Sequence, residues 1–199
     1  AVLNLTPFRQ LSAPRQRQLL SAWMKSEDLY RPAFDMVQRL FDEVIESKVD
    51  AQAALHWNQY YYVRYQQQLF RVSKAEYLAE QFQTIESIEQ RFSLNQAYAL
   101  ASGQYYIETQ KYGLSSALLE QPLQIKPRLG GEKLHLYGRV GAWPLKKAIQ
   151  SAQIFPWQRH TIQILSIDNV MLGVFTPKGF WLVESAYCEV GGWQPNLIA

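Results

Sequence analysis

Residues 125–159 read IKPRLGGEKLHLYGRVGAWPLKKAIQSAQIFPWQR, and they carry the chain's excess positive charge. The stretch has one acidic residue, Glu132, and seven basic residues: Lys126, Arg128, Lys133, Arg139, Lys146, Lys147 and Arg159. Its net charge is therefore +6, whereas the whole chain of 199 residues carries +3 and the remainder is net negative. Positive charge concentrated on one module is typical of a protein that binds a polyanion.

Glycine and proline divide this stretch into short segments. Turns are expected at Gly130-Gly131, Gly138 and Gly141. Pro144 suits the first turn of a helix, where its missing N–H costs nothing, and Pro156 ends the helical pattern. Between them, Lys146 and Lys147 lie off the apolar face formed by Leu145, Ala148, Ile149 and Ala152. The sequence thus predicts a strand, a glycine turn, a strand and a short helix presenting two lysines.

Residues 1–93, most of the chain before this stretch, are expected to form a helical domain with a β meander. Apolar residues at steps of three and four predict a helix over residues 11–25 and a second one that starts at Pro32. An alternating, tyrosine-rich pattern over residues 55–72 predicts the meander. A third helix is predicted over residues 74–92, directly before the domain boundary.

Residues 94–199 are predicted to form a small α+β domain. Strands are expected at residues 98–108, 122–127, 161–167, 170–175 and 180–183, the first two pairing with each other. The predicted fold class is therefore mixed, with a helical domain and its small meander followed by a small α+β domain.

Composition narrows the class of protein. No apolar run reaches 18 residues, so no membrane-spanning helix is expected. The single cysteine, Cys188, excludes an internal disulfide and fits the reducing cytoplasm. The chain begins Ala1-Val2-Leu3 without Met, which fits a piece of a longer protein, although processing or the choice of expressed boundaries gives the same start.

No set of residues points to catalysis or to a metal. His56, His135 and His160 are scattered, with no partner at ligand spacing. Glu132 and His135 lie three residues apart on a predicted strand and so face opposite sides, which argues against an acid–base pair. Cys188 has no activating cation nearby. We therefore predict no catalytic residue and no metal site, and a small hydrolase is disfavoured.

The twelve Tyr and six Trp allow two interpretations, core packing or stacking on unpaired bases. Arg64 lies among the tyrosines of residues 60–65, where it is either merely solvated or an RNA contact. Arg15 and Arg17 lie off the apolar face of the first helix.

The basic stretch resembles the C-terminal domain of bacterial tRNA(Ile)-lysidine synthetases. The resemblance rests on Arg128, Gly130-Gly131-Glu132, His135, Gly138-Arg139, Leu145-Lys146-Lys147, Gln150 and Pro156-Trp157-Gln158-Arg159. One departure is Gln153-Ile154-Phe155-Pro156, where the family usually reads Gly-(Ile/Val)-Pro-Pro.

The first seventy residues are similar to the substrate-binding domain of the same family. The matching positions are Arg15, Leu19-Leu20, Trp23, Pro32, Leu55-His56-Trp57, Arg64-Tyr65 and Leu69-Phe70. Ser21-Ala22 stands where the family often has basic residues, and Val63-Arg64-Tyr65 where it often has Arg-Arg-Tyr.

The resemblance implies a parent ligase that uses ATP to join lysine to the wobble cytidine of a minor isoleucine tRNA. The family does this with an N-terminal catalytic domain whose Ser-Gly-Gly-x-Asp-Ser loop is not found in this chain. ATP and Mg²⁺ would then belong to that domain, a partner of this chain, and no cofactor is expected here. The resemblance therefore implies a tRNA-recognition portion that is inactive by itself.

The residues expected to contact RNA are all cationic: Lys126, Arg128, Lys133, Arg139, Lys146, Lys147, Arg159, Arg64, Arg15 and Arg17. The alternative is a protein-interaction module with an exposed aromatic face. The sequence leaves open whether the chain is a monomer or a homodimer.

Overall fold

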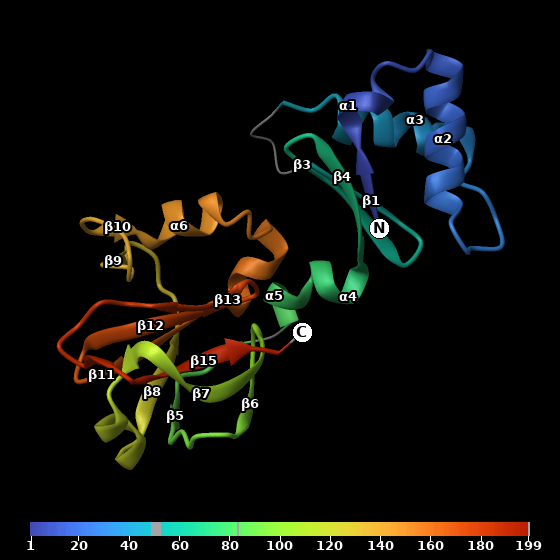
Figure 1. Ribbon diagram of the computed structural model, residues 1–199. Helices are drawn as coiled ribbons and strands as arrows, with labels where there is room; N and C mark the ends of the chain where they lie inside the picture. Colours follow the sequence, from blue (N-terminus) through green and yellow to red (C-terminus); the bar gives the residue numbers. More distant parts are fainter. Residues whose placement is uncertain (49–52, 83, 199) are drawn as a thin grey trace. The chain divides into compact units, whose positions relative to one another are not determined.

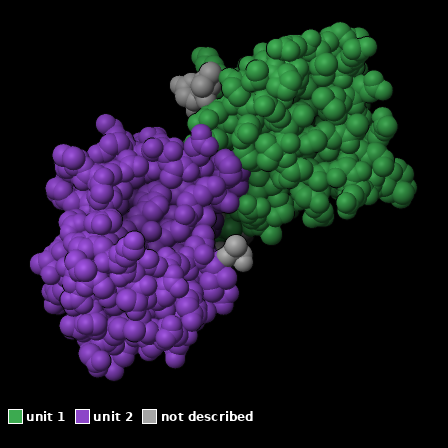
Figure 2. All heavy atoms as spheres, viewed as in Figure 1, with its two compact units in different colours: residues 1–82 green, residues 83–199 purple. Residues whose placement is uncertain are grey.

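The computed structural model describes residues 1–48, 53–82 and 84–198, and the chain divides into two compact units, Ala1–Phe82 and Gln83–Ala199 (Figures 1 and 2). The boundary predicted at 93/94 falls inside the second unit. Ile88 pairs with Ile125 of the second unit's sheet, and Phe92 is buried in that unit's core. This pairing draws the segment after residue 83 into the second unit.

Unit 1 contains a four-stranded antiparallel sheet in the order β1-β4-β3-β2. Helix α3 continues directly into a π-helical segment, η1. The elements of unit 1 are β1 (Val2–Asn4), α1 (Leu5–Phe8), α2 (Ala13–Lys25), α3 (Phe34–Arg39), η1 (Leu40–Ile45), β2 (Ala54–Trp57), β3 (Tyr60–Tyr65), β4 (Gln68–Ser73), α4 (Lys74–Tyr77) and α5 (Ala79–Phe82).

One apolar core holds unit 1 together. The buried faces of α2 and of α3–η1 supply Leu20, Met24 and Leu40, and the sheet supplies Leu55 and Tyr62. The helix expected over residues 11–25 thus corresponds to α2, and the tyrosine-rich meander to β2–β4. The three-residue strand β1, which the sequence pattern does not reveal, adds to the meander by pairing with β4.

The helix predicted over residues 74–92 is wrong beyond α5. Residues 84–87 have no regular structure, and β5 (Ile88–Gln90) pairs with β8. Ile85, Ile88 and Phe92 recur at helical spacing. A strand partner distant in the sequence decides their conformation instead.

The described part of unit 2 contains three antiparallel sheets: one of five strands in the order β13-β12-β11-β8-β5, one of four that pairs β7 with β6, β14 and β15, and a small one that pairs β9 with β10. The elements of unit 2 are β5 (Ile88–Gln90), β6 (Ala97–Leu100), β7 (Gly103–Leu114), η2 (Ser116–Glu120), β8 (Leu123–Pro127), β9 (Lys133–Leu134), β10 (Trp143–Pro144), α6 (Leu145–Ser151), η3 (Pro156–Thr161), β11 (Gln163–Ile167), β12 (Val170–Thr176), β13 (Gly179–Leu182), β14 (Cys188–Val190) and β15 (Trp193–Leu197).

Both faces of the five-stranded sheet are covered. Leu165 of β11 joins the core shared with the four-stranded sheet, which includes Trp193, while Ile164 joins a second core under α6 that includes Ile149. Every residue of β11 is consequently buried. Helix α6 thus lies on one side of the five-stranded sheet and β7 with β15 on the other (Figure 1).

The strand predicted at 98–108 is interrupted by a turn, and its predicted pairing with 122–127 is wrong. The chain turns at Ala101-Ser102, so residues 97–114 form the hairpin β6–β7. Strand β8 pairs with β11 and β5, in the other sheet. By contrast, the predicted order of strand, glycine turn, strand and helix agrees with β8, β9, β10 and α6.

Candidate RNA-binding surface

The pairing of β9 with β10 brings Lys133 to the start of helix α6. Lys133 lies opposite Pro144, and the Leu145 N–H donates to the Glu132 carbonyl at 2.9 Å. Lys146 follows Leu145 on the exposed side of α6, and Leu145 itself is fully buried. The apolar anchor of the helix therefore directs its lysines to the solvent beside Lys133.

Arg139 is held next to the same junction. Its N–H donates to the Leu136 carbonyl at 3.0 Å, and this turn places Gly138 at φ 77°, a conformation that glycine adopts without strain. The Arg139 guanidinium lies over the Trp143 ring of β10, 4.6 Å from the ring centre. We call Lys133, Arg139, Lys146 and Lys147, all exposed, the β10–α6 basic cluster.

The one acidic residue of the stretch is occupied by its own loop. The Glu132 carboxylate accepts hydrogen bonds from the N–H groups of Leu129 and Gly130, both at 2.7 Å. Burial opposes ionisation, but these N–H groups, that of Glu132 itself and the charge of Arg128 outweigh it and lower the pKa of Glu132. Its negative charge therefore stabilises the glycine turn.

Carboxylates do not neutralise the basic cluster. Across the described ranges 1–48, 53–82 and 84–198, the ion pairs within 4.0 Å are Arg9–Glu46 and Arg39–Glu43, and both lie in unit 1. An exposed cation without a bound carboxylate remains available to a phosphate.

The other predicted cations of unit 2 are half-buried. Lys126 lies on β8 and, together with Glu132, lines a cavity. Arg128 follows β8 in the loop that Glu132 closes. Arg159 lies in η3, where its Nε donates to the Ile154 carbonyl at 3.2 Å. These three flank the basic cluster in sequence, and part of each side chain serves local packing.

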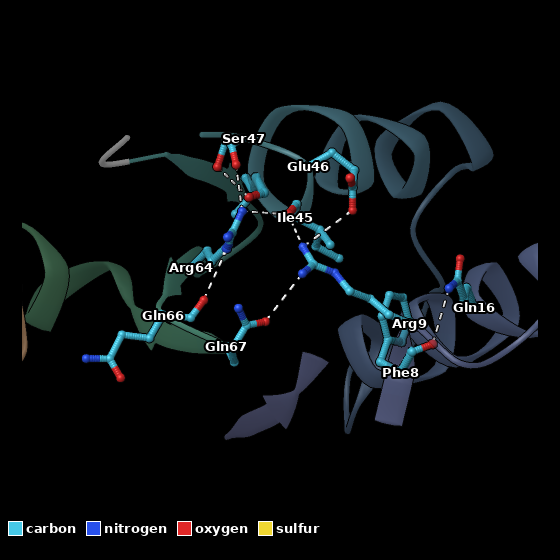
Figure 3. A network of polar contacts seen from close by, with 10 residues as sticks. Phe8, Arg9, Gln16, Ile45, Glu46, Ser47, Arg64, Gln66 and Gln67 are labelled. Atoms are coloured by element: carbon cyan, nitrogen blue, oxygen red, sulfur yellow. Dashed lines mark hydrogen bonds and ion pairs between the residues drawn. The ribbon is translucent and has the colours of Figure 1, made fainter. Parts of the chain in front are cut away.

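Arg64 is directed into unit 1, toward backbone carbonyls. Its guanidinium donates to the carbonyls of Ile45 at 2.8 Å, Ser47 at 2.6 Å and Gln66 at 3.2 Å. Arg9 donates to the same Ile45 carbonyl at 3.1 Å, as Figure 3 shows. The last carbonyls of a helix have no hydrogen-bond partner within the helix. A cation at that end also interacts favourably with the negative end of the helix dipole. The two arginines therefore cap the end of η1.

Arg15 and Arg17 are both exposed on helix α2. The guanidinium of Arg17 lies 5.6 Å from the centre of the Phe34 ring. The ten predicted cations thus fall into three groups: four at the β10–α6 junction, three half-buried nearby in sequence, and three in unit 1.

The sequence analysis missed the aromatic residues around the basic cluster. Tyr137, Trp143 and Trp181 lie beside it or line an adjoining cavity. The available signal was the position of Tyr137 and Trp143 next to Gly138 and Pro144, because turn residues lie at the surface where an aromatic ring with a polar group can stay partly exposed. Among the described residues, no group of three or more His, Cys, Asp or Glu side chains is arranged to hold a metal ion.

Two family models match the chain, one within each unit. Residues 3–70 match the TilS substrate binding domain, and residues 123–188 match the TilS substrate C-terminal domain. The chain belongs to the TilS family. The β10–α6 basic cluster lies within the TilS C-terminal domain, and the Arg9–Arg64 cap lies within the TilS substrate-binding domain.

Curated TilS relatives are named tRNA(Ile)-lysidine synthase. That of Acinetobacter baylyi is 62% identical over 199 residues, which is 99% of this chain and 43% of the relative. That of Xanthomonas campestris is 28% identical over 170 residues, 85% of this chain and 37% of the relative. The chain therefore spans less than half the length of these relatives.

A solved structure titled "Crystal structure of TILS C-terminal domain" is also similar. It is 17% identical, with a TM-score of 0.40, and the match covers 57% of this chain and 99% of that one. In the part of this TilS chain that the structure describes, no helix combines the length and apolar character needed to cross a membrane.

Proposed function

We propose that this chain recognises tRNA as part of a tRNA(Ile)-lysidine synthase. The observation that carries the proposal is the β10–α6 basic cluster, an exposed set of cations free of ion pairs among the described residues, within the TilS substrate C-terminal domain. A site of this kind binds a phosphate backbone.

The cluster acts by neutralising phosphates. Lys133, Lys146 and Lys147 replace condensed counterions, which yields affinity without reading sequence. The deep groove of an A-form stem is closed to side chains, so the contacts run along the phosphates and the shallow groove. Further contacts come from the flanking cations and the exposed cations of unit 1, namely Lys126, Arg128, Arg159, Arg15 and Arg17, whereas Arg64 serves to cap η1.

We assign lysine ligation to the portion of the curated relatives that this chain does not match. That portion would bind ATP and Mg²⁺ and join lysine to the wobble cytidine of the minor isoleucine tRNA, in the cytoplasm. This chain of 199 residues would by itself bind tRNA without forming the lysine–cytidine bond.

The proposal is tested by binding this chain to the minor isoleucine tRNA and to an unrelated tRNA at two salt concentrations. A preference for the isoleucine tRNA that persists at the higher salt means that these domains read identity themselves. Equal binding of both tRNAs that falls steeply with salt means that the chain binds the phosphate backbone without discriminating between tRNAs. Absence of binding to either tRNA at low salt refutes the proposal.

A second candidate, a protein-interaction module, is favoured by a different surface. In the loop after α2 and at the first residue of α3, Leu29, Tyr30 and Phe34 are exposed at 80%, 76% and 67%. Exposed apolar groups close together in the chain are typical of protein contacts. Under this alternative, Tyr30→Ser combined with Phe34→Ser abolishes binding of a partner protein, and neutralising Lys146 and Lys147 does not.

A further inference from the structure

A cavity of about 370 Å³ adjoins the β10–α6 basic cluster within unit 2. Its walls come from the turn at residues 136–139, from α6 and from strands β13 and β15. Most of the lining is apolar or aromatic, including Tyr137 and Trp181, and the polar groups are few: Arg139, Ser151 and Gln194. A cavity of this size and lining is typical of a site for one small ligand group.

The aromatic wall is fixed before any ligand arrives. The Tyr137 N–H donates to the Leu182 carbonyl at 3.0 Å, which ties the turn to the edge of the sheet. The Tyr137 ring stacks on Tyr112, with 4.6 Å between ring centres and 17° between planes. The Tyr112 hydroxyl donates to the Glu184 carboxylate, and this hydrogen bond raises the pKa of Tyr112 to about 12. Even so, Tyr137 remains 52% exposed.

The polar groups are also oriented. Gln194 donates one side-chain N–H to the Tyr112 carbonyl at 2.7 Å, which leaves its amide oxygen and its second N–H to offer to a ligand. Arg139 lies with its guanidinium over Trp143. An arginine stacked on an aromatic ring keeps its N–H groups at the edge of the guanidinium, where they can hold a phosphate.

We infer that this cavity takes one unpaired nucleotide of RNA, with its base against Tyr137 and Trp181 and its phosphate on Arg139. The inference rests on the proposed function, because the basic cluster must first bring the RNA to this surface. Bases in a duplex are stacked and paired, so they cannot enter a cavity of this kind, whereas an unpaired base can stack on aromatic side chains. The combination of aromatic wall and arginine favours a nucleotide over an uncharged apolar molecule.

The test uses two short RNA hairpins with equal numbers of phosphates, one blunt and one ending in an unpaired 2-aminopurine nucleotide. The chain should bind the second hairpin roughly 5- to 150-fold more tightly, the range for stacking one base. Binding should also quench the 2-aminopurine fluorescence. Equal affinity for both hairpins without quenching overturns the inference.

Two substitutions locate the effect, each with a matched control at the same position. Tyr137→Ala removes the exposed ring and Ser151→Trp fills the cavity from the exposed side of α6, so both should abolish the preference and the quenching. Tyr137→Phe keeps the ring and Ser151→Ala keeps the space, so both should retain them. Preference and quenching that survive in Ser151→Trp place the base elsewhere and overturn the inference.

The outcomes separate this inference from the proposed function. If both hairpins bind equally and their binding depends on Lys146 and Lys147, the proposed function is supported and the nucleotide site is refuted. If neither hairpin nor tRNA binds at low salt, the proposed function and the nucleotide site are both refuted.

Discussion

Arg64 provides the sharpest test of how the structure assigns roles to the cations. Replacing Arg64 with Ala removes its hydrogen bonds to the carbonyls of Ile45 and Ser47, at 2.8 and 2.6 Å in a part-buried site. In this variant Arg9 still donates a hydrogen bond to the Ile45 carbonyl, whereas the Ser47 carbonyl loses the hydrogen bond from Arg64. Hydrogen bonds from a charged donor contribute roughly 1.5–3 kcal/mol, and we expect a loss of that size from unit 1.

The assay is amide hydrogen exchange read by mass spectrometry, because it reports each unit separately. In Arg64→Ala the most protected amides of β3 and β4 should exchange roughly 10- to 150-fold faster, which is that free energy expressed as a ratio. Amides of β11 and β12 should be unchanged.

Arg15→Ala is the matched control. Arg15 belongs to the same unit, is exposed on α2, and donates no hydrogen bond to the described residues. Its exchange should change by less than about 0.5 kcal/mol, that is, roughly twofold. Wild-type exchange in Arg64→Ala together with weakened tRNA binding would refute the capping role and favour Arg64 as an RNA contact.

Two further predictions concern unit 2. Gly113→Ala should cost about 3 kcal/mol and lower the melting temperature of unit 2 by roughly 10 °C, since its Cβ would lie 2.5 Å from the Trp193 carbonyl oxygen, a backbone atom that cannot easily move. Gly131→Ala, with open space but a φ of 84°, should cost only about 1 kcal/mol, or roughly 4 °C, and equal effects on melting would contradict the packing of β7 on β15. The pKa of Glu132 is lowered in the folded chain, so its contribution to stability is full above its unfolded pKa of about 4.3 and is lost as pH falls through the folded pKa. Amide NMR shifts of Leu129 and Gly130 should therefore report opening of the turn below about pH 4, and a transition that persists in Glu132→Gln would show that another group controls it.

Local sequence patterns predicted the elements whose partners lie nearby. The apolar stripe of α2, the alternation in β3 and the glycine and proline positions around α6 each depend on a few neighbouring residues. Helix α6 in particular needs only an apolar face at Leu145 and Ile149, which the second core of unit 2 buries.

Long-range pairing is what local patterns could not supply. Ile88 fits a helical stripe as well as a strand, and its pairing with Ile125 decides between them. Strand β1 has three residues and no periodicity to read, and β4 defines it. The choice of β11 over β7 as the partner of β8 likewise depends on how two sheets share one core.

In the candidate site, too, some features follow from local sequence and others depend on residues distant in the chain. The cations of the basic cluster are evident in the sequence, because charge needs no partner to be counted. The inward direction of Arg64 was not evident, since two of its three acceptors, the Ser47 and Ile45 carbonyls, lie 17 and 19 residues away in the chain. Tyr137 and Trp181 come together only because the turn at residues 136–139 is tied to β13.

The salt dependence of tRNA binding tests the central claim most directly. Each phosphate contact removed should reduce the slope of log K against log salt by about 1. Lys146→Gln combined with Lys147→Gln should therefore flatten the slope by about 2 and weaken binding. The control, Lys111→Gln combined with Lys178→Gln, makes the same charge change at two exposed positions of unit 2 outside the cluster and should leave the slope unchanged. A slope that is unchanged in the first variant, or equally flattened in both, would contradict the claim that the β10–α6 basic cluster grips the tRNA backbone.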